Sequence, residues 1–352
     1  MDRRMSSAAD AAERAPEKAT AADVARRAGV SQSAVSRVFT PGASASRATA
    51  AKVRAAAAEL GYRPDPLARA MITGRTRMIG LVVAYLENQF YPLALERLSR
   101  ALQARGYHIL VFMAENATEK VAEVVQELID YRVDGIVTAS VALTNDLAGR
   151  LTALGIPVVM FNRGQDDPRL AEVTSDNAAG GRRATAFLIA GGHRRIAHIT
   201  GWRGASTGRD RAEGFRLAMD AAGLSPVAVE DGMYARETAA EIARALCAGR
   251  DRPDAIFVGN DHMAFGVMDA LRFGLGLDVP GDVSVVGYDD VPMAAWPAYG
   301  LTTIRQPVNR MVAATVEALL GQIEGEAAPG KTRIDGPLVV RGSARIPEGW
   351  PR

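Results

Sequence analysis

The sequence predicts a small all-α unit followed by a larger α/β core made of two doubly wound parallel sheets. Three observations lead to this prediction. Residues 20–39 carry the caps, turn and apolar spacing of two short helices that meet at an angle. From Met78 onward, apolar strand-like runs alternate with helical segments, and this rhythm occurs twice. A chain of 352 residues, 48% of them hydrophobic, is also too long for one ordinary core.

Capping residues and a glycine mark the first helix and the turn after it. Thr20 followed by Asp23 is typical of a capping box at a helix N-terminus. Gly29 supplies the left-handed residue that ends this helix, and Ser31 is a good N-cap for a second helix. The second helix buries Val35 on its inner face. We therefore predict two short helices joined by a tight turn.

The outer face of the second helix is polar without being uniformly charged. It carries Gln32, Ser33, Ser36 and Arg37, whose side chains have the length and the hydrogen-bonding groups to reach base edges in a DNA major groove. An amphipathic helical hairpin with a solvated outer face is the alternative. A third predicted helix over residues 46–61 completes a three-helix unit and favours the DNA-binding interpretation.

Charge is distributed unevenly along the chain. Nine Arg and Lys against three Asp and Glu give residues 19–76 a net charge of +6, whereas the whole chain carries +2. The first 18 residues are neutral, so residues 77–352 carry −4. A basic small unit joined to a mildly acidic body is typical of a DNA-binding protein whose larger part has another task.

The motifs of this region resemble those of one known family. Three motifs carry the resemblance: D-V-A-x-x-A-G-V-S-x-x-x-V-S-R-V from Asp23, S-x-x-T before the third helix, and G-Y-R-P followed by R-T-x-x-I-G-L-V ending at Val82. On these motifs the chain is identified as a member of the LacI family, the lactose- and purine-repressor type of bacterial transcription regulators. The resemblance covers essentially everything beyond the first eighteen or so residues.

The resemblance implies an all-α helix-turn-helix DNA-binding headpiece and an α/β periplasmic-binding-protein-like core of two doubly wound parallel-sheet subdomains. A short hinge helix from Asp65 would order when two subunits meet on DNA, with Met71 wedged into the minor groove. A linker methionine with no DNA role is the alternative. The residues expected to contact DNA are Thr20, Ser31, Gln32, Ser33, Ser36, Arg37, Arg69 and Met71.

Four segments are expected along the chain. They are a disordered tail at 1–18, the headpiece at 19–63, the hinge helix and linker at 64–76, and an effector-binding and dimerisation core at 77–352. Within the core, the N-subdomain is expected to take about 77–175 and 305–325, and the C-subdomain about 176–304 and 326–352. The strands around Arg333 and from Leu338 to Arg341 are thereby assigned to the C-subdomain.

Polar and aromatic residues follow the predicted strands of the core. Ligands of parallel α/β sheets bind outside the carboxyl ends of the strands, and carboxylates, arginines and rings there suit a small polyhydroxyl or polar ring compound. The resemblance implies that Arg211 and Asp261 hold an effector. Asp and Asn at strand ends also cap the next helix, which is the alternative interpretation. The expected effector-binding residues are Phe90, Tyr91, Asn162, Arg163, Asp176, Arg211, Asp261 and Asp289.

Together these features predict a sequence-specific transcription regulator, with repression as the expected mode. A sugar or sugar derivative in the cleft of the core would control its affinity for operator DNA. Whether the effector releases or promotes DNA binding stays open. The expected partners are a palindromic double-stranded operator, the effector and a second copy of the chain, because the eleven residues after Arg341 leave no room for a further oligomerisation helix.

Other classes of protein fit the sequence less well. The four histidines are scattered, and no H-E-x-x-H, G-x-x-x-x-G-K-[ST] or C-x-x-C motif occurs, so we expect no enzyme, cofactor or metal site. The single cysteine, Cys247, and the lack of an apolar membrane span or signal peptide indicate a bacterial cytoplasmic protein associated with the nucleoid. A transport-type sugar-binding protein without a DNA role is the alternative, but it would need a signal peptide and no basic headpiece.

Overall fold

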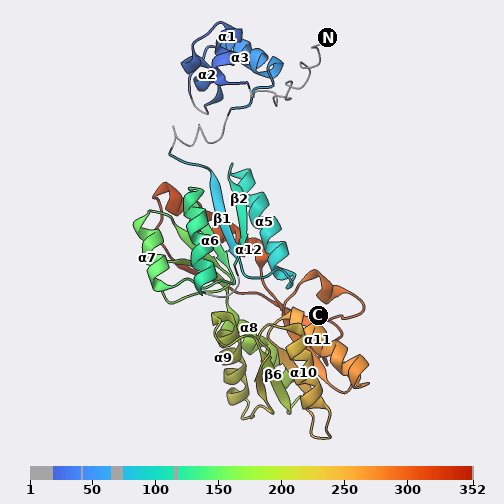
Figure 1. Cartoon of the computed structure of the whole chain (residues 1–352). Helices are drawn as coiled ribbons and strands as arrows, with labels where there is room; N and C mark the ends of the chain where they lie inside the picture. Colours follow the sequence, from blue (N-terminus) through green and yellow to red (C-terminus); the bar gives the residue numbers. More distant parts are fainter. Residues whose placement is uncertain (1–18, 41–42, 65–73, 115–117, 351–352) are drawn as a thin grey trace, which may run out of the picture. The chain divides into compact units, whose positions relative to one another are not determined.

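The computed structural model describes residues 19–40, 43–64, 74–114 and 118–350. The chain forms two compact units that divide between Thr76 and Arg77 (Figure 1). The predicted tail, Arg69 and Met71 lie outside the described residues, so the hinge helix stays a prediction. Within the described ranges, no helix has the length and apolar character needed to cross a membrane.

The smaller unit contains three helices that begin where the caps predict. These are α1 (Ala21–Ala28), α2 (Gln32–Phe39) and α3 (Arg47–Glu59). Thr20 forms the predicted capping box, and the side chains of Ser31 and Ser46 each accept a hydrogen bond from the backbone three residues further on. Gly29 ends α1 in the left-handed conformation, with φ 67°.

One valine from each helix forms the centre of this unit. Val24, Val35 and Val53 are completely buried. The rings of Phe39 and Tyr62 pack beside them, 5.9 Å apart. Helices of 8 to 13 residues are marginal alone, so the mutual burial of these side chains stabilises the whole unit.

The N-subdomain of the larger unit is a six-stranded parallel sheet of order β11-β5-β4-β3-β1-β2. Its strands are β1 (Met78–Val83), β2 (His108–Met113), β3 (Gly135–Ala139), β4 (Val158–Phe161), β5 (Ala171–Ser175) and β11 (Lys331–Ile334). Its helices are α5 (Phe90–Ala104), α6 (Thr118–Asp130), α7 (Asn145–Ala153) and α12 (Val308–Glu324). Successive strand residues point to opposite faces of the sheet: Leu81 belongs to the core cluster under α5 and α12, and Val82 to the cluster under α6 and α7. Helices on both faces explain the continuous apolar runs of these strands.

The C-subdomain repeats this plan in a sheet of order β12-β10-β9-β8-β6-β7. Its strands are β6 (Ile196–Thr200), β7 (Val229–Asp231), β8 (Ala255–Val258), β9 (Ser284–Asp289), β10 (Thr302–Arg305) and β12 (Leu338–Val339). Its helices are α8 (Asn177–Ala190), α9 (Ser206–Ala221), α10 (Arg236–Cys247) and α11 (Asp261–Asp269), with the short helices η1 (Ala270–Gly274) and η2 (Pro292–Ala295). α8 and α9 cover one face of the sheet, and α10 and α11 cover the other. All pairs in this sheet are parallel except that of β12 with β10.

One assignment made from the sequence is wrong. The strand around Arg333 is β11, which pairs with β5 and so forms an edge of the N-subdomain sheet, with Arg333 opposite Thr174. The strand at Leu338 does lie in the C-subdomain. α12 packs on the N-subdomain sheet and contacts β5, and only residues 326–330 separate its C-cap Gly325 from β11. So short a connection keeps β11 with the sheet on which α12 packs. A short, mostly exposed edge strand carries no apolar run that would reveal its sheet.

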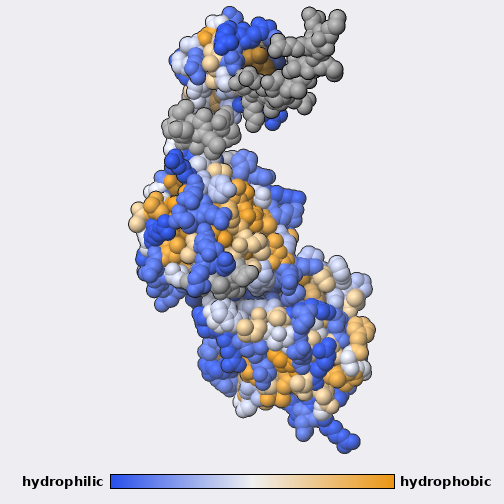
Figure 2. Space-filling model, viewed as in Figure 1, coloured by the Kyte–Doolittle hydropathy of each residue, from blue (hydrophilic) through white to orange (hydrophobic). Residues whose placement is uncertain are grey.

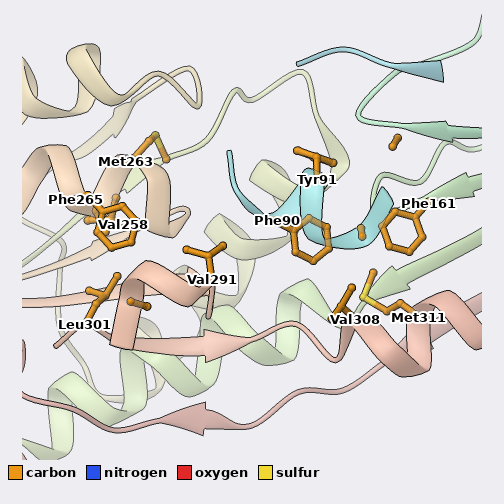
Figure 3. Packing of buried hydrophobic residues seen from close by; sticks show 14 of the residues in the cluster. Phe90, Tyr91, Phe161, Val258, Met263, Phe265, Val291, Leu301, Val308 and Met311 are labelled. Atoms are coloured by element: carbon orange, nitrogen blue, oxygen red, sulfur yellow. The ribbon is translucent and has the colours of Figure 1, made fainter. Parts of the chain in front are cut away.

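Buried rings and aliphatic side chains pack on both sides of the junction between the subdomains. Figure 3 shows Phe90 and Phe161 close to Val308 and Met311 of α12, with Phe265 in the other subdomain. The rings of Phe90 and Phe161 are stacked with centroids 6.0 Å apart. On the face shown in Figure 2, hydrophilic residues are interspersed with hydrophobic patches. The packed apolar side chains thus surround the polar residues that lie between the subdomains.

Candidate functional site

The predicted DNA-reading side chains form the exposed face of α2. Gln32, Ser33, Ser36 and Arg37 are all exposed, while Val35 on the opposite face is buried. Within the described part of the chain, Gln32 and Arg37 have no side-chain hydrogen bond or ion pair that would hold them against the protein. The face can therefore meet an external partner. Two other predicted residues have a structural task as well, because Thr20 caps α1 and Ser31 caps α2.

Arg211 lies at the centre of the core, with only 2% of its surface exposed. It projects from α9, where its Nε donates to Asn177 Oδ1 at 2.9 Å and its Nη1 donates to the carbonyl oxygen of Gly259 at 2.5 Å. The guanidinium carbon lies 3.6 Å from the centroid of the Tyr288 ring. These contacts hold the guanidinium at the carboxyl ends of the C-subdomain strands, as predicted for a ligand-binding residue.

Asp289 ends β9 and connects three parts of the core. Its Oδ2 accepts from Asn88 Nδ2 at 3.2 Å, its Oδ1 accepts from Gln306 Nε2 at 2.7 Å, and Oδ1 lies 3.7 Å from Arg211 Nη1. Asn88 belongs to the N-subdomain and Gln306 to the segment that crosses between subdomains. Burial raises the pKa of Asp289, whereas Arg211 opposes the shift. Its φ of 125° is unusual for a non-glycine residue and indicates a backbone held by its surroundings.

Asp261 lies beside Asp289 and is completely buried. Its Oδ1 accepts from Thr303 Oγ1 at 2.6 Å and its Oδ2 accepts from the backbone N–H of Val291 at 3.0 Å. Burial and the Asp289 carboxylate raise the pKa of Asp261 well above its usual range. Gly287 makes room for it, because a Cβ there would lie 2.4 Å from Oδ1. Both oxygens already have protein partners, so a direct ligand contact from Asp261 stays a prediction.

The N-subdomain contributes a polar and aromatic wall. Asn162 follows β4 with φ 69°, and its Nδ2 donates to the hydroxyl of Tyr91 at 3.1 Å, while its buried Oδ1 has no hydrogen-bond partner among the described residues. Arg163 is 5% exposed and lies 5.5 Å from the ring centroid of Trp202, in the C-subdomain. Its buried Nη1 likewise has no hydrogen-bond partner in the described part of the chain. Buried polar atoms of this kind require a partner, which makes them candidates for ligand contact.

Two predicted residues have structural roles that the sequence alone left open. Phe90 is 2% exposed and stacks on Phe161 in the core. Asp176 is the N-cap of α8, where its Oδ1 accepts from the backbone N–H of Ala179 at 3.0 Å. For Asp176 the helix-capping alternative therefore holds, and ligand contact from either residue stays a prediction.

Several residues of the cleft were not singled out from the sequence. Tyr85 packs edge-on against Tyr91 with centroids 5.3 Å apart, and the hydroxyl of Tyr234 lies 2.7 Å from Thr207 Oγ1. Burial and the neighbouring Tyr91 and Tyr234 raise the pKa of Tyr85 well above its usual range. Trp202 and Tyr234 lie in loops, two and three residues after β6 and β7, so their position beyond strand ends was the available signal.

Charged hydrogen-bonding groups and aromatic rings therefore converge between the two subdomains. Such a combination suits a small ligand with hydroxyl groups, which can both donate and accept, and with a ring or carbon frame that packs on aromatic faces. The fold and these sites together define a DNA-binding protein with a separate small-molecule-binding core.

The comparisons with known proteins agree with that class. The model of "Bacterial regulatory proteins, lacI family" matches residues 20–65, and that of the "Periplasmic binding protein-like domain" matches residues 185–344. The ribose operon repressor of Escherichia coli K12 is 35% identical over 332 residues, covering 93% of this chain and 100% of the relative. The HTH-type transcriptional repressor PurR of Vibrio vulnificus is 34% identical over 309 residues, covering 87% of this chain and 92% of the relative. The chain belongs to the LacI family.

Solved structures match over the same length. The lac repressor dimer bound to operator and the anti-inducer ONPF has a TM-score of 0.85 at 28% identity, covering 93% of this chain and 99% of that one. The complex of the regulator CelR with cellobiose has a TM-score of 0.70 at 31% identity, covering 93% and 100%. The predicted fold class and the predicted function, a transcriptional repressor with an effector-binding core, are confirmed. The family consists of repressors, not enzymes.

Proposed function

We propose that this repressor binds a palindromic operator as a homodimer, each headpiece placing α2 in the major groove of one half-site. Gln32, Ser33, Ser36 and Arg37 would contact base edges, with Arg37 bidentate to a guanine. Two features support this assignment: the exposed outer face of α2, on which Gln32 and Arg37 have no side-chain partner among the described residues, and the basic charge of residues 19–76. The segment 64–76, with Arg69 and Met71, would form the hinge between the headpiece and the core.

We further propose that a sugar or sugar derivative binds between the subdomains, against Arg211, Asp289, Asn162, Arg163 and Tyr91. The position of Asp289 carries this proposal. It accepts hydrogen bonds from the N-subdomain through Asn88 and lies against Arg211 of the C-subdomain. A ligand that hydrogen-bonds to this carboxylate would replace contacts between the subdomains. It would then shift the equilibrium between two arrangements of the subdomains, by as much as its affinities for the two arrangements differ.

The homodimer is supported by large hydrophobic side chains on the surface of the core. Phe273 is 83% exposed, Trp296 52%, Met113 51% and Val111 44%. Val111 and Met113 belong to β2, which is an edge strand of its sheet and could otherwise pair with unrelated chains. A second copy that covers these residues would bury the exposed hydrophobic side chains and would block pairing at the edge strand β2. The likeness to the lac repressor dimer supports the same assembly. We propose the bacterial cytoplasm as its location, because an operator-binding protein must reach the chromosomal DNA.

The test is an operator titration in the presence of sugars. A consensus site is first selected from random DNA by the full-length protein, and fluorescence anisotropy then measures affinity with ribose, cellobiose and further sugars added. We expect a palindromic consensus and at least one sugar that changes operator affinity several-fold or more. A protein that selects no DNA sequence, or whose affinity no compound alters, would refute the operator role or the effector role respectively.

A further inference from the structure

A cavity of about 200 Å³ lies between the subdomains, beside the predicted effector-binding residues around Arg211 and Asp289. None of the eight expected effector-binding residues lines it. The N-subdomain contributes the loop residues 87–89, which precede α5, and the C-subdomain contributes the first residues of α10 and α11 and the segment around η2. Asn88 separates the two sites, because it lines the cavity while its side-chain amide donates to Asp289 in the cleft.

The wall on the C-subdomain side is aromatic and polarisable. The rings of Phe265 and Tyr299 lie 4.4 Å apart between centroids and are tilted by 40°. Val291 and the thioether of Met293 complete this wall. Aromatic faces attract cations through their quadrupole, and sulfur is a soft, polarisable neighbour. An apolar or a cationic group fits this wall better than an anion does.

The charges around the cavity favour a cation. Arg236 is neutralised by Asp269, at 2.6 Å, and Glu237, at 3.4 Å. Burial lowers the pKa of His262 despite Glu87 and Glu237, so its ring is neutral at neutral pH. Glu87, at the exposed rim, has no ion pair or hydrogen bond with any other described residue. Asp269 and Glu237 thus compensate the one guanidinium that lines the cavity, and the carboxylate of Glu87 is available to a ligand.

We propose that this cavity binds a small organic cation, a quaternary ammonium or an amine, whose charged nitrogen lies between Glu87 and the rings of Phe265 and Tyr299. The volume equals about seven water molecules at roughly 30 Å³ each, which suits a compound of about seven to ten non-hydrogen atoms. Glu87 and the rings come from different subdomains. The occupant therefore contacts both and favours the subdomain arrangement in which the cavity is closed.

The probes are choline, tetramethylammonium, ethanolamine and putrescine, added to the full-length protein in thermal-shift and calorimetric titrations. The matched control is 3,3-dimethylbutan-1-ol, which has the shape of choline with a neutral carbon in place of the nitrogen. We expect at least one cation to raise the Tm and to bind with a measurable Kd, while the neutral compound does neither. Glu87→Gln should weaken that binding roughly tenfold.

Two variants distinguish binding in this cavity from binding elsewhere on the protein. Glu241→Gln removes another exposed carboxylate, on α10 and outside the cavity, and should leave cation binding unchanged. Arg163→Met alters the effector cleft and should also leave it unchanged. The proposal is overturned if no cation binds, if the neutral compound binds equally, or if Arg163→Met abolishes binding that Glu87→Gln spares. Operator affinity, measured separately, shows whether the proposed regulator role survives such a result.

Discussion

Arg211 offers the sharpest test of how the effector cleft is held together. Arg211→Met keeps the unbranched apolar stem and removes the guanidinium. The change deletes the hydrogen bonds to Asn177 and to the Gly259 carbonyl, removes the contact over Tyr288, and leaves Asp289 buried without its cation. Removing one partner of a buried ion pair costs about 3–5 kcal/mol. We expect a loss of that size in the free energy of unfolding, together with loss of the effector response.

Tryptophan fluorescence in urea is a suitable assay, because all three tryptophans lie in residues 77–352 and report unfolding of the core. Arg209→Met is the matched control, since Arg209 is an exposed residue of the same helix and should lose less than about 1 kcal/mol. The reasoning is refuted if Arg211→Met unfolds within about 1 kcal/mol of Arg209→Met, or if it still responds to effector at the wild-type concentration.

Three further predictions follow from the same contacts. Arg37→Ala should lose about 1–3 kcal/mol of discrimination between operator and scrambled DNA, measured by anisotropy, whereas Lys52→Ala should weaken both alike. Asp261 has a raised pKa, so the native state holds a proton that the unfolded chain releases, and stability falls as pH rises between the two pKa values. Asp261→Asn should flatten the decline in Tm above about pH 4, where an Asp of the unfolded chain releases its proton; an unchanged slope would contradict this. Gly214→Ala places a Cβ 2.1 Å from a backbone carbonyl of α8 and should cost about 1–3 kcal/mol in urea unfolding, unlike Gly149→Ala, which meets the end of a flexible side chain.

Local signals explain what could be predicted from the sequence. The caps at Thr20, Ser31 and Ser46 depend on residues three positions apart, and each one is present in the structure. The apolar strands and the two sheets were equally accessible, because strands covered on both faces need continuous apolar runs. Asp289 could be expected at the ligand site because it ends a predicted strand, and Arg211 because the resemblance to the family implies an effector-binding arginine at this position.

Contacts between distant segments explain what could not be predicted. Arg333 joins the N-subdomain sheet because α12, which precedes it, packs on that sheet and ends at Glu324. Nothing within residues 331–334 themselves indicates which sheet they join. Asp261 precedes its partner Thr303 by 42 residues, so its full burial between strands is invisible in the sequence. Trp202 approaches Arg163 across the junction of the subdomains. Such pairings arise only when both sheets are assembled.

The late strands β11 and β12 have a consequence for the order of synthesis. Both sheets of the core are completed only by residues 331–339, whereas the three-helix unit is complete by residue 62. On the ribosome the DNA-reading unit can therefore fold long before the core acquires its last strands. A nascent chain passes through a period in which it carries a finished DNA-reading unit and an unfinished sensor. Mutations that slow the docking of β11 or β12 would lengthen that period without altering any residue that contacts DNA or ligand.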